Sequence, residues 1–127
     1  MRVLLDTQVF IDLAQQHIER FGSQARKLIE DENSDLLFSA VSITEIAIKA
    51  SIKKLGITAS DVSKAVEDLR LILIPFEPRH ATRMFDLPLH HRDPFDRMLI
   101  ATALSEAVPI ITEDVEFKGY RGVKVIT

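Results

Sequence analysis

Two periods of apolar residues alternate along this chain and mark out short strands and helices. Continuous apolar runs bounded by turn residues are typical of buried strands, and they occur at residues 3–5, 36–38, 71–74, 109–112 and 123–126. Between these runs, apolar residues recur every three or four positions, as in helices with one buried face. The predicted helices cover residues 10–21, 25–29, 42–54, 62–69, 79–85 and 94–107.

This alternation of strands and helices predicts a parallel sheet covered on both faces. The length of 127 residues suits one domain, spanning residues 1–127, with a core large enough to fold without disulfides. We therefore expect a three-layer α/β domain, with a mainly parallel central sheet of about five short strands flanked by helices.

Composition narrows the possible chemistry. The chain contains no cysteine, which excludes disulfides, thiol catalysis and thiolate zinc sites, and which suits a reducing cytoplasm. No apolar run approaches the roughly 20 residues of a membrane span, and Asp6 and Asp12 interrupt any signal-peptide pattern. The net charge of -3 gives no overall basic signature, but basic patches elsewhere remain free to bind phosphate. We expect a soluble cytoplasmic protein.

Four acidic residues lie where a predicted strand ends or a predicted helix begins: Asp6, Glu45, Asp96 and Asp114. In a parallel sheet the carboxyl ends of the strands share one edge, so these side chains could converge there. Converging carboxylates repel one another unless a cation lies between them. Oxygen ligands favour Mg²⁺ or Mn²⁺ over zinc, and because Mg²⁺ keeps several waters, some of the acids would act through water.

Each of these acids also has a structural interpretation. Glu45 is the third residue after Ser42, which matches a capping box, and Lys49 follows four residues later as an ion-pair partner. Asp93 precedes Pro94, the pattern of a helix N-cap followed by proline at the first helical position.

Asp6 and Asp114 could each start a turn or cap a helix. Asp96 is harder to explain structurally, because residues 98–104 are apolar almost all round and predict a buried helix. A carboxylate at the mouth of a buried helix needs a partner, although the helix dipole can supply part of one.

Basic residues flank the acids. Lys49 and Lys53 continue the helical stripe that begins at Glu45, while Arg92 and Arg97 flank the segment 93–96. They could guide a nucleic-acid backbone towards a metal, or they could simply form solvated helix faces. Aromatic residues make up only 6% of the chain, so base stacking is not indicated.

The pair His90 and His91 lies close to Asp93 and could form an imidazole–carboxylate site for zinc or nickel. Adjacent residues rarely direct both rings at one ion, so a surface loop is the simpler interpretation.

Four segments together carry a resemblance to a known family: residues 4–7, 42–45, 91–101 and 111–114. In order and spacing they resemble a PIN-domain ribonuclease, and more narrowly the toxin of a VapBC toxin–antitoxin pair. The resemblance covers almost the whole chain, and its most specific part is the segment 91–101.

The resemblance implies an endoribonuclease dependent on Mg²⁺, with Mn²⁺ as a possible substitute. Asp6 and Asp96 would be the principal metal ligands, and Asp114 would complete the site, often through water. Glu45 would orient or activate the attacking water, and the Thr112 hydroxyl could hold a metal-bound water.

The resemblance leaves Asp93 as a cap or as an outer group of the metal site. It also implies an RNA substrate, a homodimer, and a VapB-like antitoxin whose C-terminal segment covers the catalytic groove. Exposed apolar residues on the early helices would be suitable contact points for it.

Two other functions fit the same architecture. One is a phosphotransfer domain, either an aspartyl-phosphate receiver or a haloacid-dehalogenase-like phosphatase, although residue 8 is Gln8 where that phosphatase class has a second aspartate. The other is a non-enzymatic interaction module, in which the acids serve as caps and as a docking surface. The chain has only 4 glycines and no phosphate-binding GxxxxGK loop.

Overall fold

The apolar runs form a five-stranded sheet in which all neighbouring strands are parallel. The computed structural model describes residues 1–52, 55–90 and 92–127, and within these the strand order is β3-β2-β1-β4-β5. The strands are β1 (Arg2–Leu5), β2 (Asp35–Ser39), β3 (Ile72–Ile74), β4 (Ile110–Ile111) and β5 (Val125–Ile126). Both the parallel sheet and the number of strands match the expectation from the sequence.

Helices connect successive strands and cover both faces of the sheet. The α-helices are α1 (Thr7–Ala14), α2 (Ser23–Glu30), α3 (Ala40–Ser51), α4 (Ala59–Asp68), α5 (Pro78–Arg83) and α6 (Pro94–Glu106). Short 3-10 helices follow at η1 (Ile18–Arg20), η2 (Met84–Asp86) and η3 (Val115–Gly119). None of the helices within the described ranges is long and apolar enough to cross a membrane.

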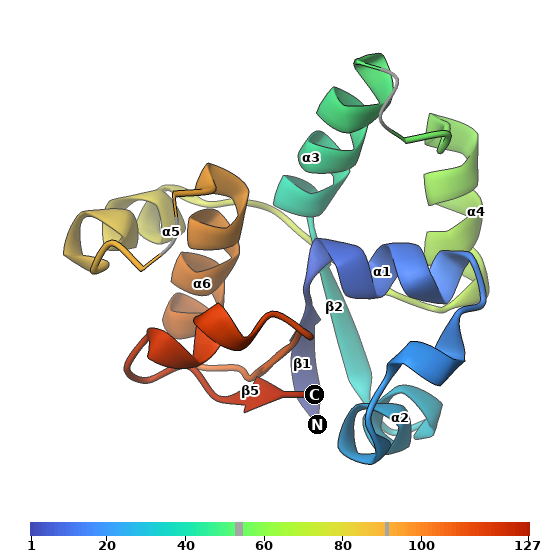
Figure 1. Ribbon diagram of the computed structural model, residues 1–127, viewed down its shortest axis with the longest axis horizontal. Helices are drawn as coiled ribbons and strands as arrows, with labels where there is room; N and C mark the ends of the chain where they lie inside the picture. Colours follow the sequence, from blue (N-terminus) through green and yellow to red (C-terminus); the bar gives the residue numbers. More distant parts are fainter. Residues whose placement is uncertain (53–54, 91) are drawn as a thin grey trace.

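Alternating residues of the central strands face two separate hydrophobic cores, because successive side chains of a strand point to opposite faces. Val3 and Leu5 pack with α1, α2 and α4, whereas Leu4 packs with α6. Figure 1 shows the same division, with α1, α2 and α4 on one side of β1 and β2, and α5 and α6 on the other. The predicted three-layer arrangement is therefore confirmed.

The first helix is shorter than its sequence pattern predicts. The apolar period runs on to Phe21, but α1 ends at Ala14 and the backbone turns at Gln16, which has a left-handed φ of 61°. The 3-10 helix η1 follows, so Phe21 is buried although it no longer belongs to the same helix. One continuous helix over residues 10–21 was thus a wrong prediction.

The third helix begins two residues earlier than expected. Its N-cap is Ser39, whose Oγ accepts a hydrogen bond from the backbone N–H of Val41 at 3.0 Å. The capping box predicted between Ser42 and Glu45 is therefore wrong. Instead, the Ser42 hydroxyl shares a buried hydrogen bond of 2.8 Å with the Thr7 hydroxyl, which ties α3 to the start of α1. The predicted end of this helix at residue 54 lies outside the described residues.

The start of α6 agrees with the sequence. Asp93 is its N-cap, and its Oδ1 accepts hydrogen bonds from the backbone N–H groups of Phe95 (2.8 Å) and Asp96 (3.2 Å). Because Asp93 satisfies these otherwise unpaired donors, the structural interpretation of this residue is confirmed.

Candidate active site

A pocket of about 230 Å³ gathers all four acids singled out in the sequence. It lies at the carboxyl end of the central strands, where parallel α/β sheets commonly bind their ligands. Its lining residues are Asp6, Thr7, Gln8, Val9, Ile11, Glu45, Lys49, Asp93, Asp96, Glu113 and Asp114. Residues more than a hundred positions apart in sequence thus meet in one place.

Neighbouring strands place Asp6 and Asp114. Asp6 follows β1 directly and caps α1, with its Oδ1 accepting the backbone N–H of Thr7 at 2.8 Å. Asp114 follows β4 and caps η3, accepting the backbone N–H of Glu116 at 2.9 Å. Because β1 and β4 pair in the sheet, their carboxyl ends bring these two acids to the same edge.

Thr112 links these two acids. Its buried hydroxyl donates to Asp6 Oδ2 at 2.7 Å and accepts the backbone N–H of Asp114 at 3.0 Å. A hydrogen bond to an ionised carboxylate is stronger than one between neutral groups. Thr112 therefore fixes the orientation of Asp6 and the path of the chain into Asp114.

Glu45 enters the pocket from α3 and is 4% exposed. Lys49, one turn later on the same helix, donates from Nζ to Glu45 Oε2 at 2.7 Å. The other carboxylate oxygen, Oε1, is buried and has no hydrogen-bond partner among the described residues. The predicted ion pair between these two residues is thus present, inside the pocket rather than on a solvated face.

Burial and mutual repulsion make the acidic pocket electrostatically unfavourable. Burial raises the pKa of Asp6 to about 6, and the charges of Glu45 and Asp114 add to the effect, although hydrogen bonds from Thr112 and Thr7 oppose it. Burial also raises the pKa of Asp96 to about 7, followed by repulsion from Asp6 and the other acids. Raised carboxyl pKa values with specific charge partners in a cleft are typical of functional sites.

The pocket favours the charged form of Lys49, whereas it disfavours the charged forms of Asp6 and Asp96. The hydrogen bond to Glu45 raises the pKa of the Lys49 ammonium above its usual value, and attraction by Glu45, Asp93 and Asp96 adds to this, while burial works against it. The lysine therefore stays charged and offsets part of the negative charge of the pocket.

The donor set suits a hard divalent cation. Within the described ranges, no three His, Asp or Glu side chains are arranged to hold a metal ion by themselves. Mg²⁺, however, usually takes one or two protein carboxylates and keeps several waters, so three converging ligands are not required. Among the described residues, Oε1 of Glu45 is buried without a partner and the pKa values of Asp6 and Asp96 are raised, so Lys49 offsets only part of the negative charge of the pocket. The residues present fit such an ion.

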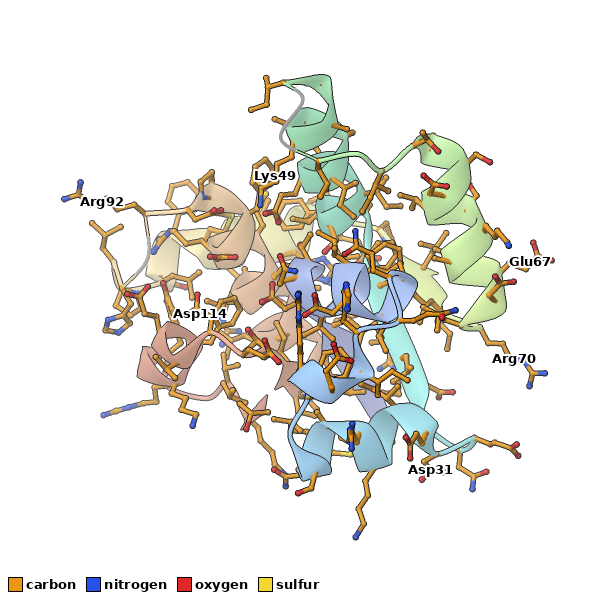
Figure 2. All side chains as sticks on the ribbon, turned by 45° about the vertical axis from the view of Figure 1, so that its right-hand side comes forward. Asp31, Lys49, Glu67, Arg70, Arg92 and Asp114 are labelled. Atoms are coloured by element: carbon orange, nitrogen blue, oxygen red, sulfur yellow. The ribbon has the colours of Figure 1, made fainter. Side chains whose placement is uncertain are left out.

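The other predicted basic residues lie differently. Arg97 donates to the backbone carbonyls of Pro88 (2.8 Å) and Leu87 (3.4 Å), so its guanidinium fastens the loop before α6. Arg92 is exposed and extends away from the body of the molecule (Figure 2). Lys53 lies outside the described residues. Of the three predicted substrate-binding residues that the structure describes, Lys49 alone lines the pocket.

Of the histidine pair, His90 is not among the residues that line the pocket. His90 packs edge-on against Tyr120, with ring centroids 4.8 Å apart. His91 lies outside the described residues, so the alternative of a zinc or nickel site at this pair stays untested.

Three polar lining residues, and the apolar Val9 and Ile11, were missed from the sequence. Thr7 and Gln8 form the first turn of α1, and Glu113 precedes Asp114. The signal for these polar residues was position alone, since Thr7 and Glu113 are adjacent to predicted acids and Gln8 lies two residues after Asp6. Gln8 also donates to the buried carboxylate of Asp12 at 3.0 Å, and so connects the pocket wall to the interior.

Comparison with known proteins bears on the fold and the family. Residues 3–123 match the family model of the PIN domain. No curated protein sequence matches the chain.

Three solved structures illustrate the likeness. A VapBC2 structure from Rickettsia felis, bound to a DNA fragment from its promoter, superposes with a TM-score of 0.74 at 17% identity, covering 98% of this chain and 97% of that chain. For VapBC-1 from nontypeable Haemophilus influenzae the TM-score is 0.70 at 20% identity, with coverages of 98% and 96%. For VapBC-5 from Mycobacterium tuberculosis, a member of the VapBC family of toxin–antitoxin systems, it is 0.59 at 20% identity, with coverages of 98% and 97%.

At these identities the solved structures establish a shared fold, while the family model matches nearly the whole chain. This protein therefore belongs to the PIN-domain family and has the fold found in VapBC toxin–antitoxin complexes, as the sequence motifs indicated.

Proposed function

We propose that this protein is a metal-dependent endoribonuclease toxin that hydrolyses RNA phosphodiester bonds and is restrained by a cognate antitoxin. The observation that carries the proposal is the meeting of Asp6, Glu45, Asp96 and Asp114 in one pocket. PIN domains are generally nucleases, and family membership favours this function over phosphotransfer or a purely structural role for the acids.

Three of the acids would hold the metal. Asp6 and Asp96 would ligate Mg²⁺, or Mn²⁺ in its place, and Asp114 would complete the site through water. A divalent cation at this position supplies Lewis acidity, since it polarises a phosphodiester oxygen and lowers the pKa of a bound water. Its charge would also relieve the repulsion that raises the pKa values of Asp6 and Asp96.

The remaining residues would position the reactants. Glu45 would accept a proton from the attacking water through its unpartnered Oε1. Thr112 would keep Asp6 oriented by the hydrogen bond of 2.7 Å. The exposed Arg92 is a candidate for contact with the RNA backbone, whereas the Lys49 ammonium binds Glu45.

Cleavage of labelled RNA by the purified protein tests this proposal. We expect cleavage with Mg²⁺ or Mn²⁺ and none with EDTA. The variants Asp6→Asn and Asp96→Asn should each lose roughly 100-fold or more of the activity, because each removes a charge that would bind the metal. The matched control is Glu67→Gln, which neutralises an exposed acid on α4, far from Asp114 in Figure 2. Full activity in both aspartate variants would refute the mechanism.

An apolar groove between α3 and α4 supports the antitoxin part of the proposal. It has a volume of about 510 Å³ and is lined by Ile43, Ile46, Ala47, Ala50, Ser51, Ile57, Thr58, Ala59, Val62 and Ser63. The same helix α3 carries Glu45 in the acidic pocket, so one bound segment could place apolar side chains in the groove and a basic side chain over the pocket. The similar structures are of VapBC toxin–antitoxin proteins, and a VapB-like antitoxin is the occupant we propose.

Co-expression with a VapB-like protein encoded in the adjacent reading frame tests this surface. Ala47→Glu, which puts a charge into the groove, should abolish co-purification, while Glu67→Gln should preserve it. Equal recovery of the partner with both variants would place the antitoxin elsewhere. Size-exclusion chromatography with light scattering on the protein alone tests the homodimer that the sequence resemblance implies.

A further inference from the structure

Lys49 has a contact that a simple phosphate-binding residue would not need. Its Nζ lies 2.7 Å from Glu45 Oε2, within a helix where both side chains line the acidic pocket. Lys49 is only half-buried, but the carboxylate that it holds is 4% exposed. Lys49 thus supplies positive charge directly to the buried Glu45 carboxylate in the pocket.

The two oxygens of Glu45 have different environments. Oε2 accepts the hydrogen bond from Lys49, whereas Oε1 is buried without a partner among the described residues. A buried acceptor that lacks a donor is costly, and it is retained where an incoming group completes it. Because Lys49 occupies one oxygen, the carboxylate cannot rotate freely, and Oε1 is the one left for that incoming donor.

We propose that Lys49 is a positioning residue that fixes the Glu45 carboxylate so that Oε1 receives the proton of the attacking water. This inference rests on the proposed nuclease function and deepens it. The contact with Oε2 does two things, since it orients the carboxylate and supplies positive charge beside a buried anion.

The step is a hydrolysis. The water oxygen forms a bond to phosphorus while one water proton passes to Glu45 Oε1, and the bond from phosphorus to the leaving oxygen breaks. The leaving oxygen takes a proton from solvent and becomes a hydroxyl, and the other RNA fragment keeps the phosphate. Glu45 then returns its proton to solvent, with Lys49 still bound to Oε2.

If Lys49 instead contacted the RNA backbone directly, its substitution would affect RNA binding rather than the chemical step. Loss of a phosphate contact weakens RNA binding and reduces its salt dependence by about one counterion. Loss of a positioning contact leaves RNA binding unchanged and slows the chemical step. The two roles are therefore separable by kinetics.

The experiment compares Lys49→Met and Lys49→Arg with wild type in steady-state cleavage of a labelled RNA. The control is Lys64→Met, which removes the same charge from an exposed Lys64–Asp68 pair with the same four-residue spacing on α4. Affinity for a non-cleavable RNA analogue is measured for each protein at several salt concentrations. We expect Lys49→Met to lower kcat about 10- to 100-fold, with KM, analogue affinity and salt dependence unchanged. Lys49→Arg should restore part of the loss, and Lys64→Met should match wild type.

Lys49→Met removes the ammonium that binds the buried Glu45 carboxylate, so a second comparison removes both charges. If Lys49 acts through Glu45, Glu45→Gln and the double variant Glu45→Gln/Lys49→Met should have equal kcat values in single-turnover cleavage. A further drop in the double variant, or a weakened and less salt-dependent binding of the analogue, would overturn the inference while leaving the nuclease function intact. Absence of cleavage by the wild-type protein would instead overturn the proposed function, and the inference with it.

Discussion

Replacing Asp96 by asparagine should stabilise the metal-free protein while it abolishes function. Burial and the charges of neighbouring acids raise the pKa of Asp96 to about 7, and no hydrogen bond from a described residue offsets this. Asparagine has nearly the same shape and carries no charge. The substitution therefore removes repulsion without removing a contact that holds the fold together.

The size and sign of the effect follow from the raised pKa. The folded protein binds the Asp96 proton more tightly than the unfolded chain, so this stabilisation is complete below about pH 4 and is lost as the pH rises through 7. A rise in the pKa of Asp96 from 3.8 to about 7 would correspond to a change of about 4 kcal/mol in the free energy of unfolding if the side chain were fully buried. Because Asp96 is only half-buried, solvent screening reduces this change to roughly 1–2 kcal/mol. We expect Asp96→Asn to raise the free energy of unfolding by that amount near pH 8 and to leave it almost unchanged near pH 4.

Urea unfolding with EDTA present, at about pH 4 and about pH 8, measures this difference in the free energy of unfolding. Glu67→Gln is the control, because it removes one negative charge from an exposed position on another face of the molecule. A loss of stability in Asp96→Asn near pH 8, or a gain of equal size at both pH values, would refute the electrostatic reasoning.

Three further predictions concern the pocket and the core. Thr112→Val should lower the free energy of unfolding by about 1–3 kcal/mol, because Asp6 loses a buried hydrogen bond; an unchanged urea midpoint would contradict this. Mn²⁺ affinity should rise between about pH 5 and pH 8 as Asp6 and Asp96, with pKa values of about 6 and 7, lose their protons; a calorimetric dissociation constant independent of pH would count against the site. Phe38→Ala should lower the free energy of unfolding by about 3–5 kcal/mol, because Phe38 is fully buried and its ring stacks on that of Phe10 with the ring centroids 4.1 Å apart. A thermal midpoint equal to that of wild type would contradict this packing.

The strands could be predicted well because each is a short apolar run, and β1, β2 and β4 are buried on both faces, although Ile72 and Leu73 of the edge strand β3 are exposed. The helix boundaries were harder to predict from the sequence. The apolar period continues from Phe10 to Phe21, yet the chain turns at Gln16 in a left-handed conformation for which no glycine provides a signal. At α3, the hydroxyl of Ser42 looked like a cap but bonds instead to Thr7 across the sheet edge, a tertiary contact that no local pattern encodes.

The acids of the site were predictable because strand ends and helix starts are visible in the sequence, and the topology of a parallel sheet brings them together. The pairing of Glu45 with Lys49 followed from their four-residue spacing. In contrast, the position of Arg97 in the sequence does not indicate that its guanidinium binds the backbone carbonyls of Leu87 and Pro88. Such contacts depend on how a loop packs against a helix, and only the folded structure supplies that.

Calorimetric titration with Mn²⁺ near neutral pH shows whether the acidic pocket binds a hard divalent cation, on which the proposed function depends. We expect saturable binding to the wild-type protein and to Glu67→Gln, and none to Asp96→Asn. Absence of saturable binding to wild type, or equal affinity in Asp96→Asn, would contradict it.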